Sequence, residues 1–300
     1  MKAFKSTELA RRLAEAGHRN FCSRDTRRGG RHGAGGAGRR PAPRQRGGRS
    51  RNAWPSWPDS LAGSRPATVA VDSVETIMAA AEARIGEVLV DVNVGMPRCG
   101  CDPTTWRNGS PTWHASLGMG VRGVMGYEGH IVGNADRAWR EEQVGVAMGA
   151  LERAHGLVGG EIVSAGGTGT YDINTWATEI QAGSFVLMDT AYGKLDLPFR
   201  QGLFLLTTVL SVSEGWAVND GGLKSLGMDH GDPEMDHATV FFCSDEHITF
   251  VPDTDHPVQV GDRLRVTPAH IDPTIARHEW LHVVDGDEVV DRWSVDLRHW

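Results

Sequence analysis

The order of apolar patterns along the chain limits the folds open to it more than any other feature. Between Ala67 and about Leu195, short apolar runs typical of strands alternate with segments whose apolar residues recur every three to four positions, as in helices. After about Leu195 the strand-like runs follow one another directly. Strands separated by helices pair in parallel, whereas closely spaced strands pair antiparallel. The pattern predicts an α/β chain, with a βα barrel or a doubly wound sheet followed by an antiparallel β-domain.

Individual elements follow from the same periodicity. The helix over 74–85 is expected to begin with a capping box formed by Asp72 and Glu75, and a longer helix is expected over Arg137–His155. Glu87–Val94 is expected to be a strand buried on both faces. The other predicted strands are Ala67–Val71, Glu161–Ser164, Phe185–Met188, Leu203–Val212, His237–Cys243, His247–Val251, Arg263–Thr267, Leu281–Val284 and Glu288–Val295.

The first 60 residues differ from the rest in charge and composition. They contain 15 Lys and Arg against 4 Asp and Glu, whereas residues 61–300 contain 16 against 34. A strand end and a helix over Thr7–Ala16, capped by Ser6 or Thr7, are predicted near the start. Residues 22–60 contain no Val, Ile, Leu, Phe, Met or Tyr, so most of this segment is expected to be disordered. One hypothesis is that it is a high-GC coding sequence read out of frame.

This Arg/Gly-rich arm also raises a second class of function. Segments such as Arg27–Gly30 and Arg44–Arg51 resemble arms that bind RNA through charge. The run has no interleaved aromatic residues, however, and the acidic remainder would repel phosphates, so a nucleic-acid partner is the less favoured alternative. An acidic body is ordinary for an enzyme of small metabolites.

Bulk properties exclude some other classes. The longest apolar run is too short to cross a membrane, and no apolar signal-peptide segment follows the N-terminus. The four cysteines form no disulfide framework. A cytoplasmic location and no membrane partner are therefore expected.

A glycine-rich run directly after a predicted strand is the strongest chemical signal. Ala165-Gly166-Gly167-Thr168-Gly169-Thr170-Tyr171 follows the strand Glu161–Ser164. Such a loop allows backbone N–H groups to approach a phosphate, and threonine hydroxyls add donors. The alternative is a tight turn with no ligand. The glycine spacing and the absence of a P-loop lysine argue against a nucleoside triphosphate or NAD.

Three further signals are weaker. In an extended segment, His270 and Asp272 would point to the same side and form a divalent-metal pair, or else a structural His–Asp hydrogen bond. Arg98 follows the strand ending at Val94, where it would face an active-site mouth or form a surface salt bridge. Lys2 begins a strand-to-helix turn, a suitable place for a Schiff-base amine, although any terminal lysine would look the same.

Several ordered segments resemble the family of D-threonine aldolases, 3-hydroxy-D-aspartate aldolases and D-serine dehydratase-like proteins, which are fold-type III pyridoxal 5′-phosphate (PLP) enzymes. The matching segments are the 166–171 loop, Glu179–Asp189 continuing to Tyr192, the stretch with Asp220, Gly222, Lys224 and Asp229, Cys243–His247, His270–Thr274 with Trp280, and Trp293–Val295. Lys2-Ala3-Phe4-Lys5-Ser6 matches the end of the family's Schiff-base motif. Together these matches extend over most of the chain.

The resemblance implies a fold and a set of site residues. The fold would be a (β/α)8-like barrel of the alanine racemase N-terminal type, followed by the β-domain. Lys2 would form the Schiff base with PLP, Arg98 would lie near the cofactor ring, and His270 and Asp272 would bind one divalent cation (Mn²⁺, Mg²⁺ or Zn²⁺). The remaining cofactor-binding residues would be Gly166, Gly167, Thr168, Gly169, Thr170, Gly183, Ser184 and Tyr192.

The resemblance also implies a domain organisation. Residues 1–22 would be the remnant of an early barrel unit, 23–63 a disordered or frame-shifted insertion, 64–194 the remainder of the barrel, and 195–300 the β-domain with the metal site. The motif before Lys2 is absent, so about one βα unit is expected to be missing before Met1. The chain as written is therefore expected to have weak activity or none.

The implied reaction is the cleavage of a small D-3-hydroxy amino acid, such as D-threonine, to glycine and an aldehyde. Asp272 favours this aldolase reading, because dehydratases of the family that use zinc tend to have cysteine there, and a carboxylate suits Mn²⁺ or Mg²⁺. The alternative is dehydration of D-serine or D-3-hydroxyaspartate to a 2-oxo acid and ammonia. His130 is a candidate general base, or else a surface histidine. The sequence leaves the oligomeric state open, a homodimer included.

Overall fold

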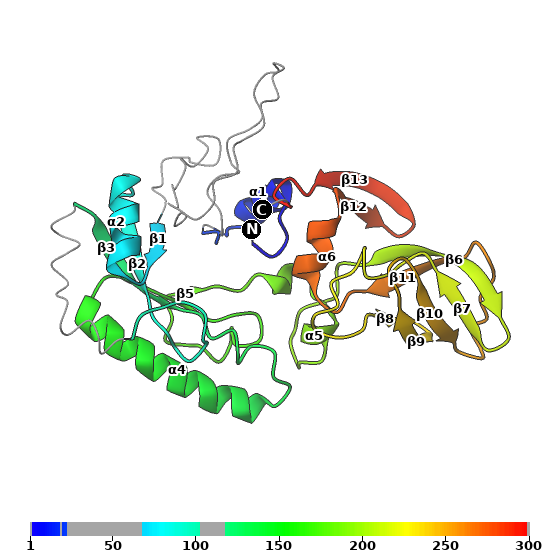
Figure 1. Ribbon diagram of the computed structural model, residues 1–300, viewed down its shortest axis with the longest axis horizontal. Coiled ribbons are helices and arrows are strands. Elements are labelled where there is room, and N and C mark those ends of the chain that lie inside the picture. The colour runs from blue at the N-terminus through cyan, green and yellow to red at the C-terminus, as the bar shows by residue number, and fades with distance from the viewer. Residues whose placement is uncertain (1, 19, 23–67, 103–117, 299–300) are drawn as a thin grey trace, which may run out of the picture.

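The structure is a computed structural model that describes residues 2–18, 20–22, 68–102 and 118–298. The predicted 23–63 insertion lies outside the described residues. Figure 1 shows a parallel sheet with its helices at one end and an antiparallel barrel at the other. Helices α1 (Thr7–Glu15) and α6 (Ile271–Arg277) lie between the two, and the hairpin of β12 (Trp280–Asp285) and β13 (Glu288–Ser294) lies next to α6 on the side of the barrel. None of the helices in the described ranges is long and apolar enough to cross a membrane.

Five parallel strands in the described part of the chain form one sheet. They are β1 (Thr68–Val71), β2 (Glu87–Asp91), β3 (Gly120–Gly126), β4 (Ile162–Ala165) and β5 (Glu179–Ile180), and they are arranged in sequence order. Helix α2 (Val74–Glu82) separates β1 from β2, and α4 (Arg137–Val158) separates β3 from β4. The predicted alternation of strands and helices is therefore confirmed, although the glycine-rich strand β3 was not predicted.

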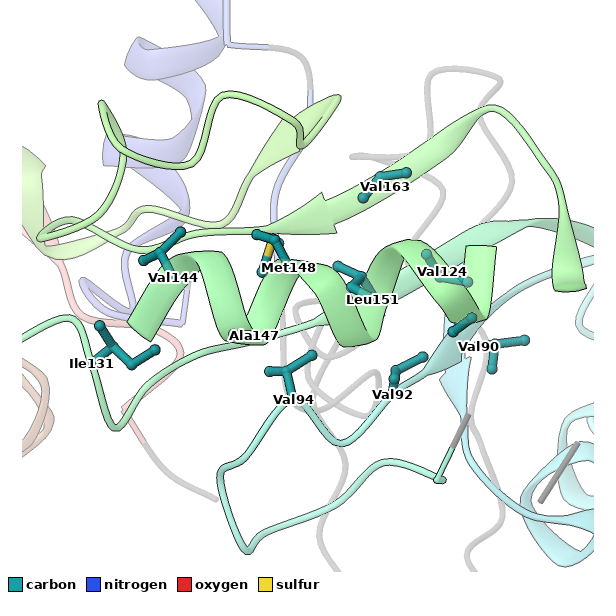
Figure 2. Packing of buried hydrophobic residues seen from close by; sticks show 12 residues of the cluster. Val90, Val92, Val94, Val124, Ile131, Val144, Ala147, Met148, Leu151 and Val163 are labelled. Atoms are coloured by element: carbon teal, nitrogen blue, oxygen red, sulfur yellow. The ribbon is translucent and has the colours of Figure 1, made fainter. Parts of the chain in front are cut away.

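Helix α4 buries one face against this sheet (Figure 2). Val144, Met148 and Leu151 recur every three to four residues along it and contact the buried strand residues Val124 and Val163. Burying an aliphatic side chain of this size contributes about 1.5–3 kcal/mol, so this face fixes the helix on the sheet.

Two helix termini differ from the predictions, and local hydrogen bonds determine where these helices begin and end. Helix α4 continues beyond His155 as far as Val158, because its end is set by Gly159, which adopts a positive φ of 72° and donates to the His155 carbonyl. The capping box of α2 is formed by Ser73 and Thr76 rather than by Asp72 and Glu75. Both hydroxyl side chains exchange hydrogen bonds with the backbone at this end.

One predicted strand is a turn. Phe185–Met188 was expected to be extended, but Ser184–Val186 forms a 3₁₀ turn, η3. The Ser184 carbonyl accepts hydrogen bonds from both Leu187 and Met188, and Met188 has a positive φ of 57°. A short helix, α5 (Thr190–Gly193), follows at once.

The predicted antiparallel domain is a closed barrel in the order β10-β7-β6-β11-β8-β9. Its strands are β6 (Leu205–Ser213), β7 (Trp216–Asn219), β8 (Glu234–Met235), β9 (Ala238–Cys243), β10 (Ile248–Pro252) and β11 (Arg263–Thr267). Val209, Ala217 and Phe250 fill its interior and are fully buried. The short strands β7 and β8 were missed by the sequence analysis.

The chain after β11 contains a helix that was not expected. Helix α6 (Ile271–Arg277) precedes the hairpin of β12 (Trp280–Asp285) and β13 (Glu288–Ser294). Its residues Ile271 and Ile275 pack with Phe4 and Leu9 of the N-terminal segment, where α1 (Thr7–Glu15) begins at the predicted cap Ser6. The Leu297 N–H also donates to the Lys5 carbonyl. The first and last described residues thus share one apolar cluster.

Candidate active site

The glycine-rich turn that follows β4 is built around a buried carboxylate. Glu128 is fully buried and accepts hydrogen bonds from the Gly166 N–H at 3.0 Å, the Thr170 hydroxyl at 2.9 Å and the Asn174 amide at 3.2 Å. The Gly167 N–H donates to Thr170 Oγ1 at 3.0 Å. Glu128 therefore fixes the shape of the loop from its inner side.

At two positions of this loop only glycine fits, because the loop packs closely against Val132. A Cβ atom at Gly169 would lie 1.8 Å from the Val132 carbonyl oxygen, and one at Gly167 would lie 2.8 Å from the Val132 side chain. Any larger residue would push the loop away from the 130–132 segment. Packing alone thus explains part of the glycine content from which a phosphate loop was predicted.

The two segments predicted to hold a phosphate meet in space. Thr168 Oγ1 accepts a hydrogen bond from the Phe185 N–H at 3.1 Å, which joins the glycine loop to Gly183 and Ser184. The Tyr192 phenol, on α5, lies close enough to the Ser184 side chain for the two hydroxyl groups to interact. Hydroxyl groups from three separated parts of the chain therefore gather in one place.

Two tyrosines extend this polar surface. The Tyr127 phenol, which follows β3, lies close enough to the Tyr192 phenol for the two to interact. Burial raises the pKa of both phenols, and the negative charges of Glu128 beside Tyr127 and of Asp189 beside Tyr192 raise it further. Both side chains are therefore protonated hydrogen-bond donors at neutral pH. The exposed Arg98 guanidinium carbon lies 5.4 Å from the centre of the Tyr127 ring, which brings Arg98 into the same neighbourhood.

The predicted Schiff-base lysine contacts one of the predicted metal ligands. Lys2 Nζ lies 2.6 Å from Asp272 Oδ1, with side chains 61% and 13% exposed respectively. The backbone N–H of Lys2 donates to the Cys22 carbonyl at 3.2 Å. Residues 270 positions apart in the sequence therefore form one charged pair.

His270 and Asp272 come together, although not in the way that was predicted. His270 Nε2 lies 3.8 Å from Asp272 Oδ2. The segment was interpreted as extended, but His270 is the N-cap residue of α6 and Asp272 lies in its first turn. The other ring nitrogen, His270 Nδ1, lies 2.8 Å from Asp229 Oδ2. If Nδ1 donates this hydrogen bond, Nε2 carries the lone pair and is directed toward Asp272, as in carboxylate–histidine–metal arrangements.

Neighbouring backbone and side chains hold this helix start in place. The buried carboxylate of Asp189 caps α5 through the Tyr192 N–H and also accepts from the Ile271 N–H, both at 3.0 Å. Burial raises the pKa of Asp189. The Thr274 hydroxyl accepts from the Gly227 N–H at 2.9 Å, which ties the Asp229 segment to α6. Asp189 thus links the start of α5, which carries Tyr192, to the start of α6, which carries Asp272.

A second imidazole adjoins His270. The His230 ring stacks on the His270 ring with centroids 3.9 Å apart and planes 8° apart. Asp229, His230 and His270 each offer one ligand atom within 4.8 Å of the others. His230 is therefore a further imidazole beside the predicted His270–Asp272 pair.

The predicted base His130 has an exposed side chain near Gly95, where an added Cβ would lie 3.0 Å from His130 Nε2. Its role stays a prediction. Four residues of the site were not predicted as site residues from the sequence: Tyr127, Glu128, Asp189 and His230. Asp229 was matched to the family without a role. A pattern of nearby residues does not identify them, because their partners lie about 40 or more positions away in the sequence. Tyr127 and Asp189 also directly adjoin segments from which other site residues were predicted.

Comparisons with known proteins place the chain in a family. Residues 5–191 match the family model described as "Alanine racemase, N-terminal domain". The chain belongs to this family. Residues 202–284 match the model "Putative serine dehydratase domain", so both parts of the predicted resemblance are confirmed.

Curated relatives carry aldolase names. The chain is 31% identical over 261 residues to a 3-hydroxy-D-aspartate aldolase of Paracoccus denitrificans, covering 77% of this chain and 66% of the relative. It is 31% identical over 248 residues to a D-threonine aldolase of Arthrobacter sp., covering 76% of this chain and 65% of the relative. The chain therefore spans about two thirds of the length of these relatives.

Solved structures agree with the predicted fold. A D-threonine aldolase from Filomicrobium marinum matches with a TM-score of 0.73 and 27% identity, over 80% of this chain and 71% of that one. The D-threo-3-hydroxyaspartate dehydratase from Delftia sp. HT23 shares the fold, with a TM-score of 0.65 and 20% identity over 78% and 73% of the two chains. The alanine racemase-type barrel domain followed by a β-domain is thus confirmed as the fold class.

Proposed function

We propose that this chain is a PLP- and divalent-metal-dependent lyase that cleaves small D-3-hydroxy amino acids to glycine and an aldehyde. The observation that carries the proposal is the 2.6 Å contact between Lys2 Nζ and Asp272 Oδ1, with His270 next to the same carboxylate. An amine and a cation site adjacent to each other are what cleavage of a 3-hydroxy amino acid requires. The aldolase names of the curated relatives support the same reaction class.

The residues present fit PLP. Thr168, Ser184 and Tyr192 supply hydroxyl groups at one place, beside the glycine-rich loop. Lys2 would hold the aldehyde carbon, and Arg98 and Tyr127 would lie along the ring. PLP, when bound, supplies an electron sink for the bond that breaks.

The residues present also fit a divalent cation. A cation already contacts Asp272 in the form of the Lys2 ammonium, and the neighbouring imidazole is oriented by Asp229. His270 and Asp272 would hold the ion, which would lower the pKa of a 3-hydroxyl group. The chain's own contribution is orientation, because the Asp189 carboxylate accepts from the Ile271 N–H and so fixes the start of α6, while the protonated phenols of Tyr127 and Tyr192 lie on the same polar surface.

The test is a product assay with the purified chain, PLP and Mn²⁺. Turnover of D-threonine, which is expected to be weak in this chain, should give glycine and acetaldehyde in equal amounts. Asp272→Asn should reduce this turnover by about 100-fold or more, since a metal ligand is lost. Release of ammonia and a 2-oxo acid instead would identify the dehydratase alternative. No product, with no borohydride-fixed PLP on Lys2, would contradict the proposal.

A further inference from the structure

Two histidines and an aspartate gather at one end of the antiparallel barrel, on residues that do not belong to the candidate active site. His237, Asp253 and His256 each offer one ligand atom within 4.8 Å of the others, and all three are exposed. His237 lies in the turn between β8 and β9, and the other two follow β10.

The backbone fixes these positions. Strands β9 and β10 pair antiparallel with Ala238 opposite Pro252, so His237 and Asp253 form the next cross-strand pair. The Asp253 N–H donates to the His237 carbonyl at 2.9 Å, which continues the ladder by one bond. The His256 N–H then donates to the Asp253 carbonyl at 3.0 Å, in a turn that brings His256 back over the pair.

His237 adopts a backbone conformation that is uncommon for a residue with a side chain. Its φ is 56°, in the left-handed region. The turn from β8 to β9 would accommodate glycine or asparagine with less strain. Histidine is among the residues that adopt this conformation more often than most, so the turn can present the imidazole at this position.

The two imidazoles are oriented side by side. Their ring centroids lie 3.7 Å apart with planes 11° apart. Asp255 Oδ1 lies 3.1 Å from His256 Nδ1. When Nδ1–H donates to this carboxylate, the lone pair is on Nε2, which is the second carboxylate–histidine arrangement in the molecule.

We propose that His237, Asp253 and His256 bind a divalent transition-metal ion of the Zn²⁺ class. Two imidazole nitrogens and one carboxylate oxygen are a donor set that such ions accept, with water completing the coordination. A bound ion must lie in the plane of each ring, so the stack opens by rotation about the Cβ–Cγ bonds, which exposed side chains make freely. The ion would join the β8–β9 turn to the segment after β10.

The test measures Zn²⁺ binding by calorimetry to the full chain, purified without a histidine tag. His237→Asn keeps a residue that tolerates positive φ, and His256→Asn changes a turn outside the ladder, so both variants should fold. Each variant should lower the Zn²⁺ affinity of one class of site by about tenfold or more. Asp255→Asn should lower the affinity of the same class by roughly tenfold. His282→Asn, an exposed histidine on β12, is the matched control and should change nothing.

The outcomes are distinct from those of the proposed function. His270→Asn should remove the candidate active-site ion and leave the site at His237 intact. Unchanged Zn²⁺ stoichiometry and affinity in both His237→Asn and His256→Asn would overturn the proposal. Equal weakening by His282→Asn would also overturn it, because the binding would then be nonspecific.

Discussion

The Asp272 carboxylate lies next to two other functional side chains, those of Lys2 and His270. In the described structure Asp272 Oδ1 is 2.6 Å from an ammonium group, while Oδ2 is 3.8 Å from His270 Nε2. A divalent cation held by His270 and Asp272 would lie close to the Lys2 charge. The two cations therefore compete for Asp272 unless the lysine nitrogen is drawn elsewhere.

Lys2→Met should for this reason bind Mn²⁺ more tightly than the unchanged chain when PLP is absent. The expected gain is about fivefold, equivalent to roughly 1 kcal/mol for a pair with one exposed partner. Titration of free Mn²⁺ by electron paramagnetic resonance measures it. Lys224→Met removes the same charge from the exposed Lys224–Glu246 pair and should leave the affinity unchanged. Equal affinities in Lys2→Met and the unchanged chain would contradict the competition.

The buried carboxylate of Glu128 holds the glycine-rich loop in place. Its carboxylate accepts three hydrogen bonds and is fully buried, so removing it leaves three donors without an acceptor. Glu128→Ala should destabilise the protein by about 3 kcal/mol or more, a fall of roughly 5–10 °C in the thermal midpoint. Differential scanning calorimetry measures the change. Glu141→Ala, on the exposed face of α4, is the control and should shift the midpoint by about 1 °C or less. A small shift for Glu128→Ala would show that the loop does not depend on the carboxylate.

At the scale of the element, Asp91 at the end of β2 has a pKa raised to about 6, chiefly by burial and then by the negative charge of Asp72. A carboxyl whose folded pKa lies above its unfolded value contributes stability below the unfolded pKa of about 4, and this is lost as pH rises through 6. Asp91→Asn should therefore stabilise the protein at pH 7–8, by at most about 3 kcal/mol, and have little effect at pH 4. Urea denaturation at both pH values tests this. A stabilisation independent of pH would contradict the cause given.

Most helices and strands were predictable because their patterns are local. Val144, Met148 and Leu151 recur at helical spacing, and Ser6 precedes α1 as an N-cap should. The glycines of β3 hid that strand, since Gly123 is needed where a Cβ would lie 1.9 Å from the Ile162 carbonyl oxygen. Helix α6 was missed because His270 begins it without a side-chain cap, while Asp189 supplies the hydrogen bond from 82 positions away.

The residues of the candidate site likewise fall into those that were predicted from the sequence and those that were not. The residues read from motifs, such as Thr168, Ser184 and His270, lie where the structure brings polar groups together. The residues that were missed hold other residues in place, and Glu128 and Asp189 do so through contacts with distant segments. Their function depends on tertiary structure, which a single sequence does not reveal.

At the scale of the whole molecule, α1 joins the two ends of the described chain. Leu9 is buried with Ile271, Ile275 and Val295, so the segment that carries Lys2 depends on α6 and on the residues after β13. Leu9→Ala should lower the free energy of unfolding by about 2–5 kcal/mol. It should also lower the yield of PLP fixed on Lys2 by borohydride, measured by mass spectrometry at a temperature where the protein remains folded.

The control for this prediction is Met78→Ala on α2, whose side chain is 51% exposed and lies in a different part of the molecule. It should change neither stability nor labelling by much. Full labelling of a destabilised Leu9→Ala chain would show that Lys2 is positioned by local contacts alone.

The hydrogen bond between the Leu297 N–H and the Lys5 carbonyl has a consequence for synthesis. A ribosome adds about 5–20 residues each second, so Lys5 emerges some tens of seconds before Leu297 exists to meet it. During that interval α1 has no Val295, Ile271 or Ile275 to pack against. Lys2, the proposed cofactor amine, is therefore synthesised well before the residues of α6 and the end of β13 against which the neighbouring α1 packs.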